Sequence, residues 1–329
     1  MIDTIYIEEN ILHHPRVVDI LVRFPKARQI ICERYTQVFN PKAQNFRLQK
    51  QNPALILAEK YQHCVLPAPA GYGIGSQHNY YFSHVLNCLY DCRYCFLQGM
   101  YQSAHTVLFV NYESFQAEIS ELCHATPTET LHFFSGYDGD SLALEPITRF
   151  AEHFLDFFAN LPNAFLELRT KSTQVRSLLN RSPLDNAVVA FSLSPDVIAR
   201  KVEAKAPSLQ RRLDALVKLQ AHGWQIGLRF DPLIYQDDYR EQYQQLFAQV
   251  FEQIDLNQLH SVSLGTFRLP EAFFKKIHKL YPEEKLLAGS FVNQQGMMSY
   301  SKAIEQDMMG YCSEQLLTYI SANQFFPCQ

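Results

Sequence analysis

Six short apolar segments alternate with longer segments of helical spacing from about residue 78 onward. The strand-like segments are rich in β-branched and aromatic residues, and they are NYYFSHVL (79–86), TLHFFSG (130–136), AFLELRT (164–170), AVVAFSLS (187–194), WQIGLRFDPLI (224–234) and SVSLGTF (261–267). Amphipathic helical patterns between or after them cover 111–125, 145–161, 208–223 and 239–254. Regular alternation of strand and helix predicts an α/β fold with a parallel sheet.

The number of these units narrows the architecture. Six βα units are fewer than the eight that close a full (β/α)8 barrel. An open, partial (β/α)6 barrel fits the count better than a doubly wound sheet, although strand counting alone does not separate the two. The loop PAPAGYGIGSQ (67–77) is rich in glycine and proline and indicates a boundary. We therefore predict an N-terminal segment (1–77), a partial barrel (78–270) and a C-terminal extension (271–329) that packs on the barrel.

Composition and charge restrict the class of protein. The N-terminal sequence MIDTIYIEEN lacks the basic and apolar regions of a secretion signal, and no stretch approaches the roughly 20 apolar residues of a membrane span. We expect a cytoplasmic protein with reduced thiols and no membrane contact. The formal net charge is −4, and no basic stripe typical of nucleic-acid binding is visible.

Three of the eight cysteines lie close together in NCLYDCRYCFLQ (87–98), and they are Cys88, Cys92 and Cys95. They follow the first strand-like segment, where α/β folds place ligand-binding loops. Three thiolates on a cubane of four irons leave one iron open to a non-protein ligand. The alternative is a structural zinc site in which His84 completes a Cys3His set. The C-x3-C-x2-C spacing favours the iron–sulfur cluster.

The cysteine motif, followed by an aromatic residue, resembles that of the radical S-adenosylmethionine (AdoMet) superfamily. More narrowly, the chain resembles the spore photoproduct lyase family. The similar segments are IYIEENILHHP (5–15), NCLYDCRYCFLQ (87–98), FVNYESF (109–115), LELRTKS (166–172), VVAFSLSPDVI (188–198), LVKLQAHGWQIGLRFDPLIY (216–235) and FFP (325–327). The resemblance implies a partial (β/α)6 radical AdoMet barrel with small terminal additions and a [4Fe–4S] cluster on Cys88, Cys92 and Cys95.

The resemblance also implies an activity. AdoMet would chelate the open iron, and its reductive cleavage would give a 5'-deoxyadenosyl radical that abstracts hydrogen from the substrate. The implied enzyme is a carbon–carbon lyase that repairs a thymine photoproduct in DNA, supplied with electrons by flavodoxin or ferredoxin. Lys171 matches a lysine near the AdoMet carboxylate, and Ser192 matches a serine that contacts AdoMet. Ser135 and Gly136 match the turn beside its amino group.

Two substitutions separate the chain from the family pattern. Tyr137 occupies the position of the cysteine that returns a hydrogen atom to the product radical, and Phe96 replaces a tyrosine after the third cluster cysteine. Tyr94 before that cysteine is kept. We therefore expect Tyr137 and Tyr94 to be the catalytic side chains. Two further readings remain open on the sequence: a radical AdoMet enzyme with a non-DNA substrate (a nucleotide, RNA, peptide or metabolite), and a zinc-stabilised binding module without turnover.

Overall fold

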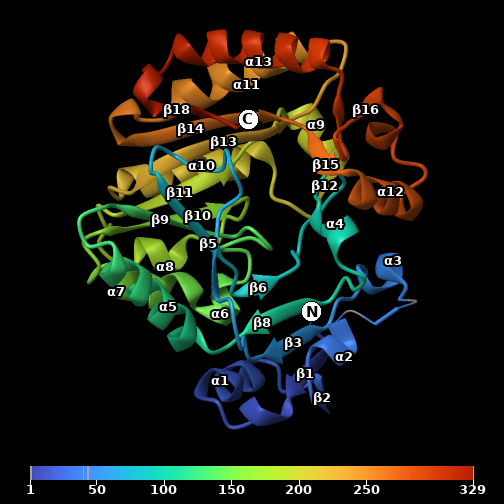
Figure 1. Cartoon of the computed structure of the whole chain (residues 1–329), viewed down its shortest axis with the longest axis vertical. Helices are drawn as coiled ribbons and strands as arrows, with labels where there is room; N and C mark the ends of the chain where they lie inside the picture. Colours follow the sequence, from blue (N-terminus) through green and yellow to red (C-terminus); the bar gives the residue numbers. More distant parts are fainter. Residues whose placement is uncertain (1, 40, 43, 329) are drawn as a thin grey trace.

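A curled sheet of mostly parallel strands forms the centre of the molecule (Figure 1). The computed structural model describes residues 2–39, 41–42 and 44–328. All six predicted segments contribute a parallel strand, and these are β5 (His78–Phe82), β9 (Leu131–Ser135), β10 (Ala164–Thr170), β11 (Ala187–Ser192), β13 (Gln225–Leu233) and β14 (Leu259–Thr266). The first predicted segment (79–86) is not one strand, because its last two residues, Val85–Leu86, belong to the second sheet. Two short strands extend the edges: β4 (Val65–Pro67) pairs antiparallel with β5, and β18 (Phe325–Pro327) pairs parallel with β14. The sheet is a half-barrel, which confirms the partial-barrel prediction.

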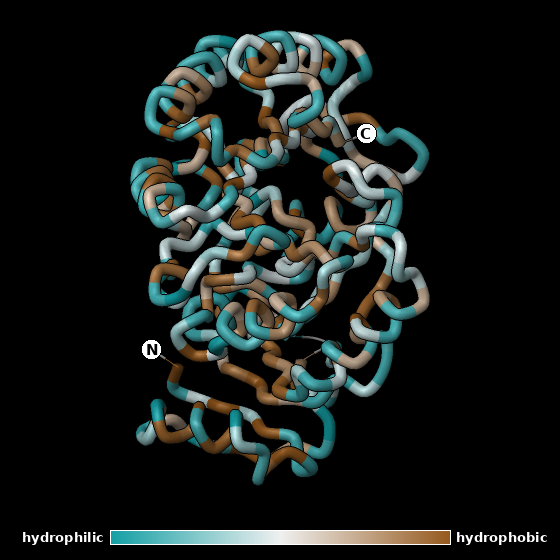
Figure 2. Tube along the Cα trace, turned by 90° about the vertical axis from the view of Figure 1, so that its left-hand side faces the viewer, coloured by the Kyte–Doolittle hydropathy of each residue, from teal (hydrophilic) through white to brown (hydrophobic). Residues whose placement is uncertain are grey.

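Helices cover the outer face of this half-barrel (Figure 1). They include α5 (Tyr112–Ala125), α7 (Phe150–Phe158), α10 (Leu209–Ala221), α11 (Tyr239–Gln253) and α13 (Lys302–Leu317). The other helices after residue 77 are α4 (Leu97–Met100), α6 (Glu145–Thr148), α8 (Arg176–Leu179), α9 (Asp196–Val202) and α12 (Glu271–Leu280), and α4 packs against α12. Hydrophobic residues follow the strands and the inner helix faces, whereas hydrophilic residues dominate the outer turns (Figure 2). None of the helices in the described ranges is both long and apolar enough to cross a membrane.

Local signals explain where two of these helices begin and end. The Ser208 hydroxyl accepts a hydrogen bond from Arg211 N at 3.5 Å and caps α10, and Gly223 follows the helix with φ +100°. The helical pattern over 145–161 is not one helix, because Arg149 adopts a left-handed conformation between α6 and α7. The Glu145 carboxylate then accepts bonds from Ala151 N (2.9 Å) and Glu152 N (3.3 Å), which caps the start of α7.

A second sheet carries the N-terminal strands. Its order is β2 (Arg28–Cys32), β1 (Thr4–Glu8), β3 (Leu55–Ala58), β8 (Thr106–Phe109) and β6 (Val85–Leu86). The remaining N-terminal helices are α1 (Pro15–Arg23), α2 (Thr36–Phe39) and α3 (Phe46–Gln49). Because β6 and β8 follow residue 77, strand pairing crosses the predicted boundary there. The three-part division of the chain stays a prediction.

Smaller pairings complete the fold. β7 (Asp91–Cys92) pairs with β12 (Glu203–Ala204), and β15 (Arg268–Pro270), β17 (Met297–Tyr300) and β16 (Phe291–Gln294) form an antiparallel sheet. Single 3-10 turns are η1 (Glu9–Ile11), η2 (Leu256–Gln258), η3 (Lys285–Ala288) and η4 (Ala322–Gln324). The β7–β12 pair matters for function, because β7 carries one of the clustered cysteines.

Candidate active site

A cavity of about 310 Å³ lies where several strands of the half-barrel end. Gly136 follows β9, Lys171 follows β10, Ser192 ends β11 and Asp231 lies near the end of β13, and all four line it. The carboxyl ends of parallel strands are the usual ligand-binding edge of an α/β fold. Side chains far apart in the sequence therefore meet in one place.

The cysteine loop forms one wall of this cavity. Cys88, Cys92 and Cys95 all line it and none forms a disulfide. Asn87, with φ 72°, turns the chain into the loop, and its side-chain amide donates to Ser103 O at 2.9 Å. The buried Lys50 ammonium donates to Cys88 O at 2.7 Å. The backbone of the loop is thus fixed from both sides before any metal binds.

The environment of the three thiols sets their proton affinity. Burial, aided by the nearby Asp140 carboxylate, raises the pKa of Cys88 to about 12. Burial also raises the pKa of Cys92 and of Cys95, although Lys171 opposes it at both. Metal ligation requires the thiolate form, so a bound metal would displace these protons.

His84 does not join the three thiols. Its ring stacks on Phe150 with 3.6 Å between ring centroids, and burial lowers its pKa to about 3. His84 is not a lining residue of the cavity. Within the part of the chain that the structure describes, no three His, Cys, Asp or Glu side chains converge where one metal ion could sit. A cubane needs no such convergence, because each thiolate binds a different iron. The donor set therefore fits a cluster better than a Cys3His zinc site.

Ser135 and Gly136 have different surroundings. The Ser135 hydroxyl is fully buried, donates to Glu167 O at 2.9 Å and lies 2.8 Å from the Ser141 hydroxyl, so it serves the barrel wall. Gly136 lines the cavity with φ +84°, and a Cβ there would lie 2.7 Å from Ser141 Oγ. Only glycine fits this turn without strain.

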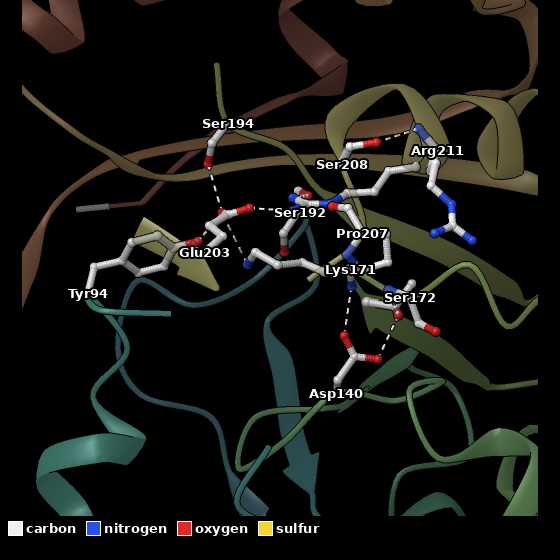
Figure 3. Close-up of polar contacts among 12 residues, drawn as sticks. Tyr94, Asp140, Lys171, Ser172, Ser192, Ser194, Glu203, Pro207, Ser208 and Arg211 are labelled. Atoms are coloured by element: carbon white, nitrogen blue, oxygen red, sulfur yellow. Dashed lines mark hydrogen bonds and ion pairs between the residues drawn. The ribbon is translucent and has the colours of Figure 1, made fainter. Parts of the chain in front are cut away.

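Lys171 and Ser192 lie together on the wall (Figure 3). The side chain of Lys171 is 15% exposed, and its ammonium lies 4.0 Å from Glu203 and 5.5 Å from the ring centre of Tyr94. The backbone N–H of Lys171 donates to Asp140 at 2.7 Å. Asp140 also accepts from the Thr170 hydroxyl at 2.7 Å, so it fixes the end of β10.

Glu203 is the centre of a buried polar network (Figure 3). Tyr94, Ser194 and Arg212 all donate hydrogen bonds to its carboxylate. Burial would raise the pKa of Glu203, but the charges of Lys171 and Arg212 hold it below its usual value. The Tyr94 hydroxyl is thus engaged by a carboxylate although its ring lines the cavity. Sequence patterns pointed to neither Asp140 nor Glu203, because single acidic residues carry no spacing signal.

Aromatic rings surround Tyr137. Its ring centroid lies 4.4 Å from that of Tyr81, 5.8 Å from that of Tyr72 and 5.6 Å from that of Phe96. Tyr137 and Phe96 both line the cavity. Burial raises the pKa of Tyr137, so its phenol stays protonated at neutral pH.

Two arginines mark another part of the cavity. Arg169 and Arg268 line it together with Asp231, and each guanidinium lies 3.9 Å from that carboxylate. A Cβ built on Gly265 would be 3.0 Å from both Arg268 Nη1 and Cys328 Cβ and 3.1 Å from Asp231. Cys328 therefore adjoins this arginine pair, whereas Cys312 is fully buried on α13.

Known proteins resemble this chain in sequence and in fold. A sequence profile of the family described as Spore photoproduct lyase matches residues 76–311. Spore photoproduct lyase of Bacillus subtilis (strain 168) is 24% identical over 205 residues, which cover 60% of this chain and 59% of that protein. The same enzyme of Geobacillus sp. (strain Y412MC61) is 24% identical over 208 residues, with the same shares of 60% and 59%. Both sequence matches thus span less than two thirds of the length of these curated relatives.

Solved structures match over the whole chain. A spore photoproduct lyase variant with bound AdoMet and dinucleoside spore photoproduct aligns with a TM-score of 0.86 at 16% identity, covering 100% of this chain and 98% of that one. A spore photoproduct lyase complexed with the dinucleoside spore photoproduct aligns with a TM-score of 0.84 at 15% identity and the same coverage. At these identities the alignments establish the fold. The sequence profile of the family matches more than half of the residues of this chain, and the chain therefore belongs to the spore photoproduct lyase family.

Proposed function

We propose that the chain is a radical AdoMet lyase that repairs a thymine photoproduct in DNA. The observation that carries this proposal is the single cavity in which Cys88, Cys92 and Cys95 meet Gly136 and Lys171. When bound there, a reduced [4Fe–4S] cluster would supply the electron that cleaves AdoMet, giving the 5'-deoxyadenosyl radical that abstracts hydrogen from the lesion. The family relatives whose structures hold AdoMet and the dinucleoside lesion support the choice of both ligands.

Residues of the chain would bind and orient the cofactor. Cys88, Cys92 and Cys95 would each ligate one iron. The Lys171 ammonium would pair with the AdoMet carboxylate in a charge-assisted hydrogen bond. Gly136 would let the backbone approach the cofactor, because no Cβ stands between them, and Ser192 would offer a hydroxyl on the same wall.

The substrate would lie toward Arg169 and Arg268. Both residues line the cavity, and each guanidinium lies 3.9 Å from Asp231, while Arg169 also donates to the Tyr72 hydroxyl at 2.7 Å. Guanidinium groups bind phosphates, and the aromatic rings of Tyr72 and Tyr137 offer surfaces for base stacking. These features favour a nucleic-acid lesion over a peptide or small metabolite, although the net charge of the chain is −4.

Tyr137 is the proposed hydrogen donor in place of the family cysteine. Its ring lines the cavity and its phenol keeps its hydrogen at neutral pH. Phe96 has no phenolic hydrogen, and Tyr94 donates its own to Glu203. Flavodoxin or ferredoxin would deliver the electron. All eight cysteines are free thiols, which suits the reducing cytoplasm as the site of action.

Anaerobic reconstitution tests the metal and cofactor parts of the proposal. The protein should take up about four irons per chain, and alanine at any one of the three cysteines should prevent this. With reductant, the wild type should convert AdoMet to 5'-deoxyadenosine and methionine, while Cys123→Ala, a buried thiol on α5, should keep both properties. Stoichiometric zinc without iron in an anaerobic preparation would contradict the proposal and favour a binding module.

A further inference from the structure

One buried carboxylate accepts hydrogen bonds from three segments of the chain, and one of them, the cysteine loop, lines the cavity (Figure 3). The Glu203 side chain is fully buried on β12. It accepts hydrogen bonds from Tyr94 of the cysteine loop, from Ser194 beyond β11 at 3.1 Å and from Arg212 of α10. Such a carboxylate fixes the relative positions of the elements that donate to it.

The charges around Glu203 do not cancel. Arg212 is 1% exposed and forms a buried ion pair with Glu203, and its Nη1 also donates to Ser192 O at 3.1 Å. Lys171 is a second cation, 4.0 Å from the same carboxylate. One carboxylate and two cations leave a single positive charge, and Lys171 carries it on the cavity wall. An anionic group of a ligand would be a further partner for this charge.

The backbone of Glu203 contacts the cysteine loop as well. β12 pairs antiparallel with β7, with Glu203 opposite Cys92, and Arg93 N donates to Val202 O at 2.8 Å. Glu203 therefore touches the loop twice, through its backbone and through the Tyr94 hydroxyl. A lysine side chain is long and flexible, so a nearby fixed carboxylate decides where its ammonium stays.

We propose that Glu203 is a positioning residue for cofactor binding: it holds the Lys171 ammonium on the cavity wall and fixes Tyr94, and with it the cysteine loop. The proposal rests on the proposed function, because the anionic group that Lys171 meets is taken to be the AdoMet carboxylate. Glu203 itself touches neither cofactor nor substrate. It acts on binding through Lys171 and on the loop through Tyr94.

A double-mutant cycle tests the link to Lys171. Lys171→Ala should weaken AdoMet binding to the cluster-loaded protein by about 10- to 100-fold, because a charge-assisted bond is lost. Glu203→Gln keeps the size of the side chain and should weaken binding by about 5- to 10-fold. In the Lys171→Ala background, Glu203→Gln should change affinity by less than about twofold, because a residue that acts through Lys171 has no effect without it.

A second buried ion pair provides the matched control. Glu167 of β10 bonds with Arg229 of β13 at 2.7 Å, and both side chains are 2% exposed. Glu167→Gln breaks a comparable pair in the barrel wall, so it should lower the unfolding temperature about as much as Glu203→Gln does. The AdoMet affinity and the iron retention of Glu167→Gln should stay within about twofold of the wild type. This result would show that general loss of stability does not explain the effects of Glu203→Gln.

Iron retention reports on the loop independently of turnover. Glu203→Gln should lose cluster iron to a chelator several times faster than the wild type, and Tyr94→Phe should reproduce part of this effect. If Glu203→Gln does not fold, Glu203→Gln with Arg212→Met removes both charges of the buried pair and should restore folding but not AdoMet affinity.

The outcomes separate the inference from the function on which it rests. Wild-type protein that holds its cluster but does not bind AdoMet would overturn both. Normal binding by the wild type with unchanged affinity in Glu203→Gln would overturn the inference alone. Equal losses in Glu167→Gln, or an undiminished effect of Glu203→Gln in the Lys171→Ala background, would also overturn it and reduce Glu203 to a structural ion pair.

Discussion

Single residues decide which chemistry the cavity can perform, and Tyr137 is the most informative of them. The sequence comparison predicts that Tyr137 takes the position of the family cysteine, and Tyr137 lines the cavity. Cys328 lies beside Asp231 and Arg268, which line the cavity, whereas Cys312 is fully buried on α13. Of these groups Tyr137 lines the cavity, and its ring lies 5.6 Å from that of Phe96 in the cysteine loop.

Tyr137→Phe should stall repair after the first hydrogen abstraction. The ring and its packing remain, and only the phenolic hydrogen is removed. AdoMet cleavage with the dinucleoside lesion should continue, while the yield of repaired thymines falls at least about tenfold, equivalent to a barrier raised by ~1.4 kcal/mol or more.

Two variants serve as controls for this prediction. Tyr81→Phe changes the neighbouring ring, 4.4 Å away, and should leave the product ratio unchanged. Product analysis by chromatography and solvent-deuterium incorporation measures the effect. A normal product ratio in Tyr137→Phe, with stalling in Cys328→Ala, would assign the transfer to the thiol.

At the scale of elements, the turn after β9 positions the cavity wall. Gly136 adopts φ +84°, and an added Cβ would meet Ser141 Oγ at 2.7 Å and Arg169 O at 2.9 Å. Gly136→Ala should therefore lower the free energy of unfolding by about 1–3 kcal/mol. Gly310 lies exposed within α13 with open space around its Cα, so Gly310→Ala should raise it by about 0.5–1 kcal/mol. Denaturant unfolding of the cluster-free protein measures both. Equal effects of the two changes would contradict the strained turn.

The junction of α6 and α7 should give stability a pH dependence. Burial raises the pKa of Glu145 to about 7 in the fold from a usual value of 4.5. The folded state therefore binds more protons than the unfolded state between these values, and stability falls as pH rises through them, by up to ~1.4 kcal/mol per pH unit from this group. Glu145→Gln removes the titration, so the stability of the variant relative to wild type should rise from pH 5 to pH 8. A difference that stays constant over this range would contradict the raised pKa.

At the scale of the whole molecule, the sequence predicted the strands of the barrel better than the helix break at Arg149 and the N-terminal sheet. The six strands were found because buried parallel strands are continuous apolar runs between amphipathic helices. The helix over 145–161 was predicted as continuous because no proline or glycine marks Arg149, where the break depends on capping by Glu145. The N-terminal sheet was missed because β6 and β8 reach it from beyond residue 77, and no local pattern reports such pairing.

Part of the site was also predictable from local sequence patterns. Clustered cysteines carry their own spacing, and Gly136, Lys171 and Ser192 come at strand ends, so the fold brings them together. Glu203 and Arg212 meet Tyr94 and Lys171 only through tertiary structure, from β12 and α10. Arg169 of β10 and Arg268 of β15 likewise come to line the same cavity only through tertiary structure.

Lesion-dependent cleavage of AdoMet is the most direct test of the proposed repair of a thymine photoproduct. Anaerobic protein with an intact cluster should be reduced and mixed with AdoMet, with and without the dinucleoside spore photoproduct. We expect 5'-deoxyadenosine to form at least about tenfold faster with the lesion, and repaired thymines to appear in the same reaction. A rate that does not depend on the lesion, as a dinucleoside or within duplex DNA, would contradict DNA repair as the function of this cavity.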